Sequence, residues 1–137
     1  MNIPEWAING VVACLCFIVG GKFPDVDLAP VFPLRHRSAW THGLLIPLAV
    51  WYATGLHPLA WWGAVGFLPA LALHLFADCW PKSWSGSALI KLYPLPFSLP
   101  GWASFLWILA GAFVSFWVWW SPLGVGDLVL GFVGRWW

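Results

Sequence analysis

The chain has 137 residues, of which 61% are hydrophobic and 8% are charged, and its formal net charge is +1. A water-soluble domain carries roughly 25% charged residues, so this composition excludes an ordinary soluble domain. The small net charge excludes the basic surface of a nucleic-acid-binding protein. The mean hydropathy of +0.81 and the 14 Trp indicate a chain whose solvent is lipid, and its length suits one integral membrane domain over residues 1–137.

Four apolar stretches predict the helices in chain order. The first, 5–21, is long enough to cross a bilayer and lacks the basic n-region of a secretory signal peptide, so we expect a retained membrane helix. The second, 42–56, is short for a full span. It either crosses the membrane or forms a re-entrant helix. The third is 58–78, and the fourth, 102–121, is rich in Trp and Phe. We expect an all-α, polytopic membrane bundle of about four transmembrane or re-entrant helices.

Two loops share one side of such a four-helix bundle, namely 22–41 and 79–101. They hold five of the six basic residues of the chain: Lys22, Arg35, Arg37, Lys82 and Lys91. Cytoplasmic loops carry the excess of Lys and Arg, so this side is expected to face the cytoplasm. The sequence therefore predicts a multi-pass membrane protein with this side in the cytoplasm.

The scarce polar side chains gather at the same side. Each of three segments contributes at least two of them: Asp25 and Asp27 after the first helix, His36, Arg37 and His42 before the second, and His74 and Asp78 at the end of the third. Ionisable residues close to lipid are costly, and a functional role is their default interpretation.

The segment PDVD places two carboxylates two residues apart. In an extended backbone, Asp25 and Asp27 point to the same side, and Pro24 favours that backbone before it. Taken alone, the segment also fits a turn that caps a helix.

The segment HLFAD spaces a His and an Asp by four residues. His74 and Asp78 therefore share one helical face, which suits two ligands of one metal or a carboxylate that orients a ligating His. Taken alone, the pair also fits a hydrogen bond between helices. His36 and His42 lie six residues apart and do not share a helical face, so at least one of them lies in a loop.

Together these groups form an oxygen and nitrogen ligand set, which suits Zn, Mn, Fe or Mg. The candidate metal ligands are Asp25, Asp27, His36, His42, His74 and Asp78. This many ligands also leaves room for two adjacent ions.

Three motifs in order, FPDVD, HRSAWTHG and HLFADCWP, give the chain a family resemblance over about residues 19–96. It resembles the membrane-bound metal-dependent hydrolases, the YdjM-like bacterial inner-membrane proteins. The resemblance implies a small helical inner-membrane protein with a divalent metal at the six ligands named above, and it also matches Arg37 and Thr41. The chain departs from the family pattern at Leu28, where the family often has His, and at Gly43, where it has Ser.

Two functions follow as hypotheses. The first is a metal-dependent hydrolase of a phosphoester or carboxylic ester, with a lipid or lipid-linked substrate at the cytoplasmic face. In it, Arg37 holds a phosphate or the developing negative charge, and Asp78 serves as general base. The second is a non-catalytic, degenerate membrane subunit of a larger complex, with or without a pigment or haem, in which the Trp-rich helix packs against partner helices or a pigment. Expected partners are membrane lipid and membrane proteins or a second copy of the chain.

Overall fold

The structure is a computed structural model that describes residues 4–28, 37–81, 83, 85, 88–92 and 95–120, except for the side chains of residues 27, 28 and 58. Within these ranges every named element is a helix: α1 (Glu5–Lys22), the 3-10 helix η1 (Phe23–Leu28), α2 (Leu45–Thr54), α3 (Pro58–Asp78) and α4 (Gly101–Trp120). The all-α prediction is confirmed.

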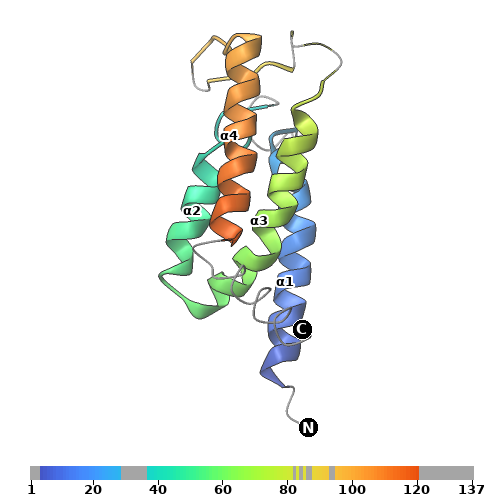
Figure 1. The fold of residues 1–137 in the computed structure, drawn as a ribbon, viewed down its shortest axis with the longest axis vertical. Coiled ribbons are helices and arrows are strands. Elements are labelled where there is room, and N and C mark those ends of the chain that lie inside the picture. Colours follow the sequence, from blue (N-terminus) through green and yellow to red (C-terminus); the bar gives the residue numbers. More distant parts are fainter. Residues whose placement is uncertain are drawn as a thin grey trace, which may run out of the picture.

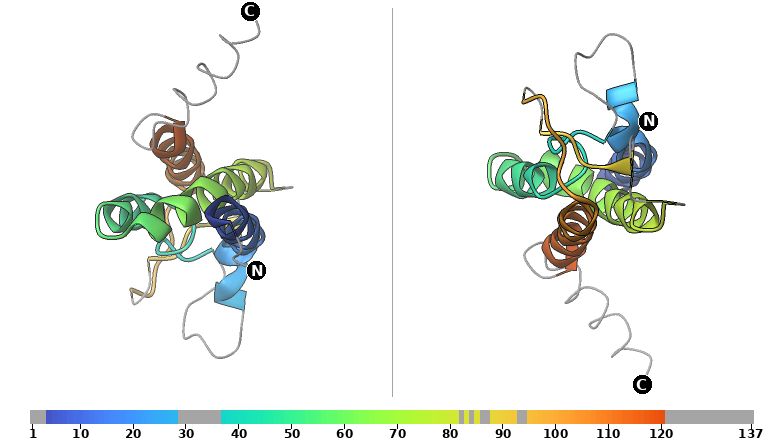
Figure 2. Two further views of the ribbon diagram at one scale, coloured as in Figure 1. Left: turned by 90° about the horizontal axis from the view of Figure 1, so that it is seen from below. Right: turned by 90° about the horizontal axis from the view of Figure 1, so that it is seen from above.

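The four α-helices run alternately up and down (Figure 1). The C-terminal ends of α1 and α3 and the N-terminal ends of α2 and α4 therefore lie at one end of the bundle. The central helix is α3, which packs against α1, α2 and α4, as the views along the bundle show (Figure 2). The segments that carry the polar motifs thus meet at one end of the molecule, as the sequence predicts.

Three of the helical stretches are long and apolar enough to cross a membrane: Glu5–Val26, Leu59–Asp78 and Gly101–Trp120. The helix α2 has 10 residues. It rises about 15 Å, half of the roughly 30 Å hydrocarbon core. The sequence predicts helix from residue 42, but α2 begins at Leu45 because residues 37–44 form a loop packed inside the end of the bundle.

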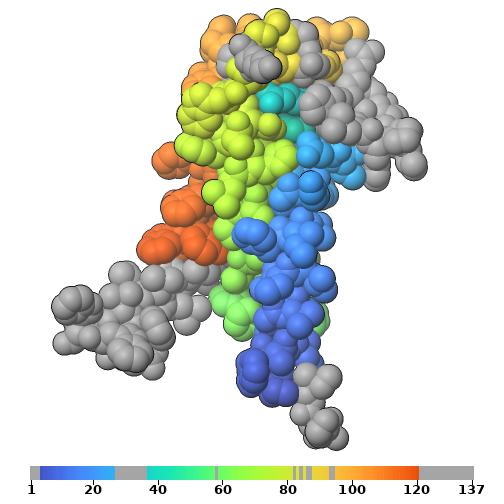
Figure 3. Space-filling view, turned by 90° about the vertical axis from the view of Figure 1, so that its right-hand side faces the viewer, coloured from blue at the N-terminus to red at the C-terminus, as the bar shows by residue number. Residues whose placement is uncertain are grey.

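Contact between α1 and α3 depends on small residues. A Cβ atom on Gly66 would lie 1.9 Å from the carbonyl oxygen of Ala13, and one on Gly20 would lie 2.3 Å from that of Phe67. The two backbones therefore come into direct contact at these two places, where α1 lies beside α3 on one face of the molecule (Figure 3). Small residues permit such close approach in membranes, where packing, not the hydrophobic effect, drives helix association.

A proline lies in the middle of α3, where it removes one backbone hydrogen bond. Pro69 has no N–H to donate to the carbonyl of Val65, four residues earlier. The indole Nε1–H of Trp119 on α4 donates to that carbonyl instead, at 3.0 Å. The replacement satisfies a polar group that lipid could not satisfy and ties α3 to α4.

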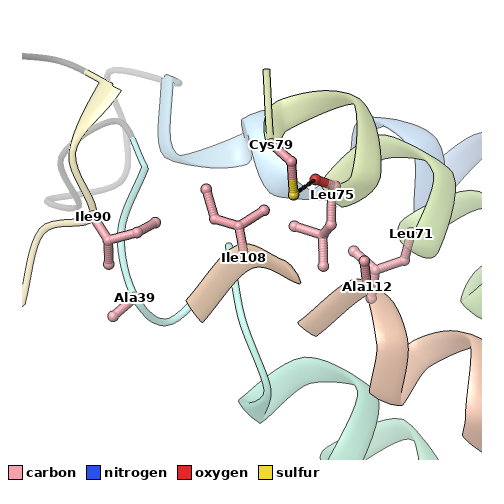
Figure 4. Close-up of a cluster of buried hydrophobic side chains, with 7 residues drawn as sticks. All are labelled: Ala39, Leu71, Leu75, Cys79, Ile90, Ile108 and Ala112. Carbon is pink, nitrogen blue, oxygen red and sulfur yellow. Dashed lines mark hydrogen bonds between the residues drawn. The ribbon is translucent and has the colours of Figure 1, made fainter. Parts of the chain in front are cut away.

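Two loops cover the end of the bundle that carries the polar motifs. The backbone N–H of Lys91 donates to Arg37 O and that of Ala39 donates to Lys91 O, both at 2.9 Å. Ser104 at the start of α4 accepts from the N–H of Ile90 at 3.0 Å. Side chains of both loops, Ala39 and Ile90, join α3 and α4 in a buried apolar cluster with Leu71, Leu75, Cys79, Ile108 and Ala112 (Figure 4).

The prediction of an extended PDVD segment is wrong. The chain leaves α1 through η1, and the N–H of Phe23 still donates to Val19 O, so the helix tightens without unwinding. Pro24 fits there because its fixed φ is compatible with a helical turn. A 3-10 helix has three residues per turn, which removes the geometric reason for Asp25 and Asp27 to point the same way.

Candidate metal centre

Three separate segments of the chain lie close together where α1 and α3 end, at the upper end of the bundle in Figure 1. Asp25 comes from η1, His42 from the buried loop before α2, and His74 from the last turns of α3. Each offers one ligand atom, and these three atoms all lie within 4.8 Å of one another. This group of one carboxylate and two imidazoles can hold a metal ion.

Asp78, one helical turn beyond His74, faces the same group. Its Oδ2 atom lies 3.5 Å from His74 Nε2 and 3.3 Å from His42 Nε2. Asp25 Oδ1 lies 3.8 Å from His74 Nε2. The prediction that His74 and Asp78 share one helical face is confirmed, and Asp78 Oδ2 lies beside both imidazoles, next to the group of three ligand atoms.

The hydrogen bond of His74 decides which ring nitrogen faces the carboxylates. Its Nδ1 atom lies 2.8 Å from the carbonyl oxygen of Gly21, near the end of α1. A carbonyl only accepts, so Nδ1 carries the proton and donates it. In the neutral ring the lone pair is then on Nε2, the atom directed at Asp25 and Asp78.

The ring of His42 is fixed by a chain of two hydrogen bonds. Its Nδ1 lies 2.9 Å from Thr41 Oγ1, and that hydroxyl donates to Ser38 O at 3.3 Å. A hydroxyl has one hydrogen, so with that hydrogen on Ser38 O, the ring Nδ1–H donates to Thr41. Both imidazoles thus direct Nε2 into the same space, with the orientation that a hydrogen bond on the other nitrogen imposes on metal-ligating His.

Burial increases from one side of the group to the other. The side chain of Asp25 is 40% exposed, that of His74 is 18% exposed and that of His42 is 0% exposed. Among the described residues of the group, Asp25 is therefore the most exposed and His42 the most deeply buried.

Gly43, directly after His42, is needed for the packing of α4. A Cβ atom there would lie 2.0 Å from Trp107 Nε1, and the backbone of Gly43 lies so close to α4 that a Cβ on Gly111 would meet it at 2.8 Å. A side chain at residue 43 would therefore collide with α4.

Cys79 follows Asp78 but is not a ligand candidate. Its Sγ donates to the carbonyl of Leu75 at 3.5 Å within the apolar cluster, as the dashed line in Figure 4 shows. Burial, with a smaller contribution from the charge of Asp78, raises the pKa of this thiol, and a thiol must lose its proton to bind a metal.

Of the predicted site residues, four come together: Asp25, His42, His74 and Asp78. Arg37 lies beside them with its guanidinium on Asp78. The side chain of Asp27 and all of His36 lie outside the described residues, so their predicted roles as ligands stay predictions. The sequence reasoning missed the carbonyl of Gly21, because a backbone acceptor leaves no trace in residue type.

Comparisons with known proteins found no match: no protein-family model, no curated protein and no solved structure matches the chain.

Proposed function

We propose that this chain is a membrane-embedded, metal-dependent hydrolase of phosphoesters or carboxylic esters. The observation that carries the proposal is the convergence of two Nε2 atoms and two carboxylate oxygens, from three segments, on one space. Without an ion, these four atoms attract one another only if the imidazoles carry protons on Nε2, whereas one divalent cation between them would attract all four lone pairs at once.

The donor set restricts the ion. Imidazole nitrogen suits Zn and Fe, and carboxylate oxygen suits Mn and Mg, so a set with two of each favours Zn, Mn or Fe over Mg. The charges of Asp25 and Asp78 offset those of a divalent ion. Such an ion supplies Lewis acidity and lowers the pKa of a water bound to it.

We assign the remaining roles, which are holding the ion and taking a proton from water, to individual residues of the chain. His42 and His74, held through their Nδ1 atoms, fix the position of the ion. Asp78 completes the ligand set, and we assign it there in place of the general-base role. Asp25 is the most exposed of the four, and while one of its oxygens would hold the ion, its other oxygen is the carboxylate oxygen we assign to take a proton from water.

The location of the site favours a lipid or lipid-linked substrate. The ligands lie at the ends of the long apolar stretches, where a bilayer meets water. The basic residues of the loops at this end favour the cytoplasmic face, and the resemblance noted above favours a bacterial inner membrane.

Hydrolysis should depend on His74 and not on His57. Mixed micelles would present a phosphatidic acid, a phospholipid and a carboxylic ester of matched chain length to protein loaded with Zn, Mn, Fe or Mg. We expect turnover of at least one substrate class, and a loss on the order of 100-fold or more in His74→Ala. His57→Ala is the matched control, because its Nδ1 accepts from Leu59 N at the opposite end of α3.

Two outcomes contradict the proposal. Equal losses in His74→Ala and His57→Ala would mean that the site is not responsible for the activity. Metal-loaded protein that turns over none of the substrate classes would favour the non-catalytic membrane subunit instead.

A further inference from the structure

Arg37 has an unusual backbone. Its φ is 57°, and it is the one residue other than glycine with positive φ in the part of the chain that the structure describes. Residues with a Cβ adopt this region at a cost and stay in it only where the surroundings fix them. The surroundings do so here, because Arg37 is buried and its carbonyl accepts from Lys91 N at 2.9 Å.

Three hydrogen bonds of the guanidinium to described residues connect it to the end of α3 and to the loop that follows. Nη2 donates to Asp78 Oδ1 at 2.9 Å, and Nη1 donates to the backbone carbonyls of Asp78 and Ala88, each at 3.3 Å. The planar guanidinium therefore binds both the carboxylate and the main-chain carbonyl of Asp78. Two hydrogen bonds from one rigid group to the same residue fix the rotation of its carboxylate.

The held carboxylate presents its two oxygens unequally. Oδ1 is bound to Arg37, and Oδ2 is the atom that faces the imidazoles of His42 and His74. We infer that Arg37 is a positioning residue that restricts Asp78 to one donor oxygen for the ion. This inference rests on the proposed metal site and deepens it. A carboxylate free to turn would offer both oxygens, whereas catalytic metal sites keep a position for water or substrate.

Cobalt and azide test the inference without any substrate. Co²⁺ reports its surroundings by visible absorption, and azide reports whether an anion can still join the ion. The variants are Arg37→Gly and Arg37→Asn in the full chain in detergent, because Gly and Asn both tolerate positive φ. Each therefore removes the guanidinium without adding backbone strain.

We expect wild type and both variants to take up Co²⁺. Azide should bind about tenfold more weakly in the variants, because the second oxygen of Asp78 then occupies the coordination position that azide takes in wild type. Added guanidinium ion should restore azide binding in Arg37→Gly. Folded variants that bind azide as well as wild type, or that lose Co²⁺ itself, would overturn the inference alone. Wild type that takes up no Co²⁺ would overturn the metal site and the inference with it.

If neither variant folds, a measurement on wild type tests whether Asp78 binds the ion through one oxygen. Infrared difference bands recorded on adding Co²⁺ distinguish a carboxylate bound through one oxygen from one bound through both. One-oxygen bands that disappear in Asp78→Asn would support the inference, and two-oxygen bands that disappear in the same variant would overturn it.

Discussion

Asp78→Ala is expected to destabilise the protein by about 3 kcal/mol even when no metal is bound, because it leaves the charge of Arg37 buried without its carboxylate. The side chains of Arg37 and Asp78 are 9% and 23% exposed, so water screens the pair only in part. The same substitution removes the oxygen that faces both imidazoles. Thermal unfolding in detergent with a chelator present measures the first effect, and metal content measures the second.

Asp78→Asn is the matched variant. An amide has the shape of the carboxylate and one oxygen that can still accept from Arg37, so most of the stability should remain while metal binding falls. If Asp78→Ala unfolded at the wild-type temperature, the ion pair would contribute nothing to the fold. If Asp78→Asn kept full metal content, Asp78 would not belong to the ligand set.

Gly66→Ala is expected to separate α1 from α3. The added Cβ would lie 1.9 Å from Ala13 O and 2.7 Å from Ala13 C, both backbone atoms that cannot turn aside. Overpacking of this kind costs about 1–3 kcal/mol, against a gain of up to about 1 kcal/mol for Ala over Gly in a helix. The metal affinity should fall as well, because α1 carries the carbonyl of Gly21 that holds His74.

Gly10→Ala on α1 is the control, since a Cβ there meets nothing within 4 Å. It should be as stable as wild type or more so. Thermal unfolding and Co²⁺ titration of the two variants, side by side, measure both effects. Equal stability of Gly66→Ala and Gly10→Ala would show that the two helices are not in the close contact described.

The long helices were predictable because the types of residue at their ends indicate where they begin and end. The predicted ranges 5–21 and 58–78 match α1 (Glu5–Lys22) and α3 (Pro58–Asp78). The third helix begins with Pro58, a residue favoured in the first turn of a helix. The first ends at Lys22, one residue after a Gly pair and two residues before Pro24. Apolar runs of this length have no stable alternative to a helix in lipid.

The buried loop before α2 could not be predicted in the same way. Hydropathy extends the second helix to His42, whereas residues 37–44 stay irregular: the backbone groups of Arg37 and Ala39 pair with Lys91, far along the chain, and those of Thr41 and His42 donate to Ser38 O. Pairing over such a distance leaves no periodicity. The 3-10 turn at Asp25 was missed for the opposite reason: a local rule for Pro24 was overruled by the continuing hydrogen bonds of α1.

In the candidate site, too, the local contacts were predictable from the sequence and the long-range contacts were not. The pair His74 and Asp78 follows from the helical repeat, and its alignment with Asp25 and His42 follows from helix order. The bond from Arg37 to Asp78 joins residues 41 positions apart and needs the fold to be seen. The close contact at Gly66 did leave a signal, since Gly66 and Ala70 on α3 and Cys16 and Gly20 on α1 each form a small-xxx-small pair.

Metal content tests the central claim most directly. The full chain, purified in detergent without chelator, would be analysed by mass spectrometry before and after resupply of Zn, Mn and Fe. The account predicts near-stoichiometric metal in wild type and its loss in Asp25→Ala and His74→Ala. Wild type that holds no metal after resupply would contradict it, and the converging Asp and His side chains would then be ion pairs that join the ends of the helices.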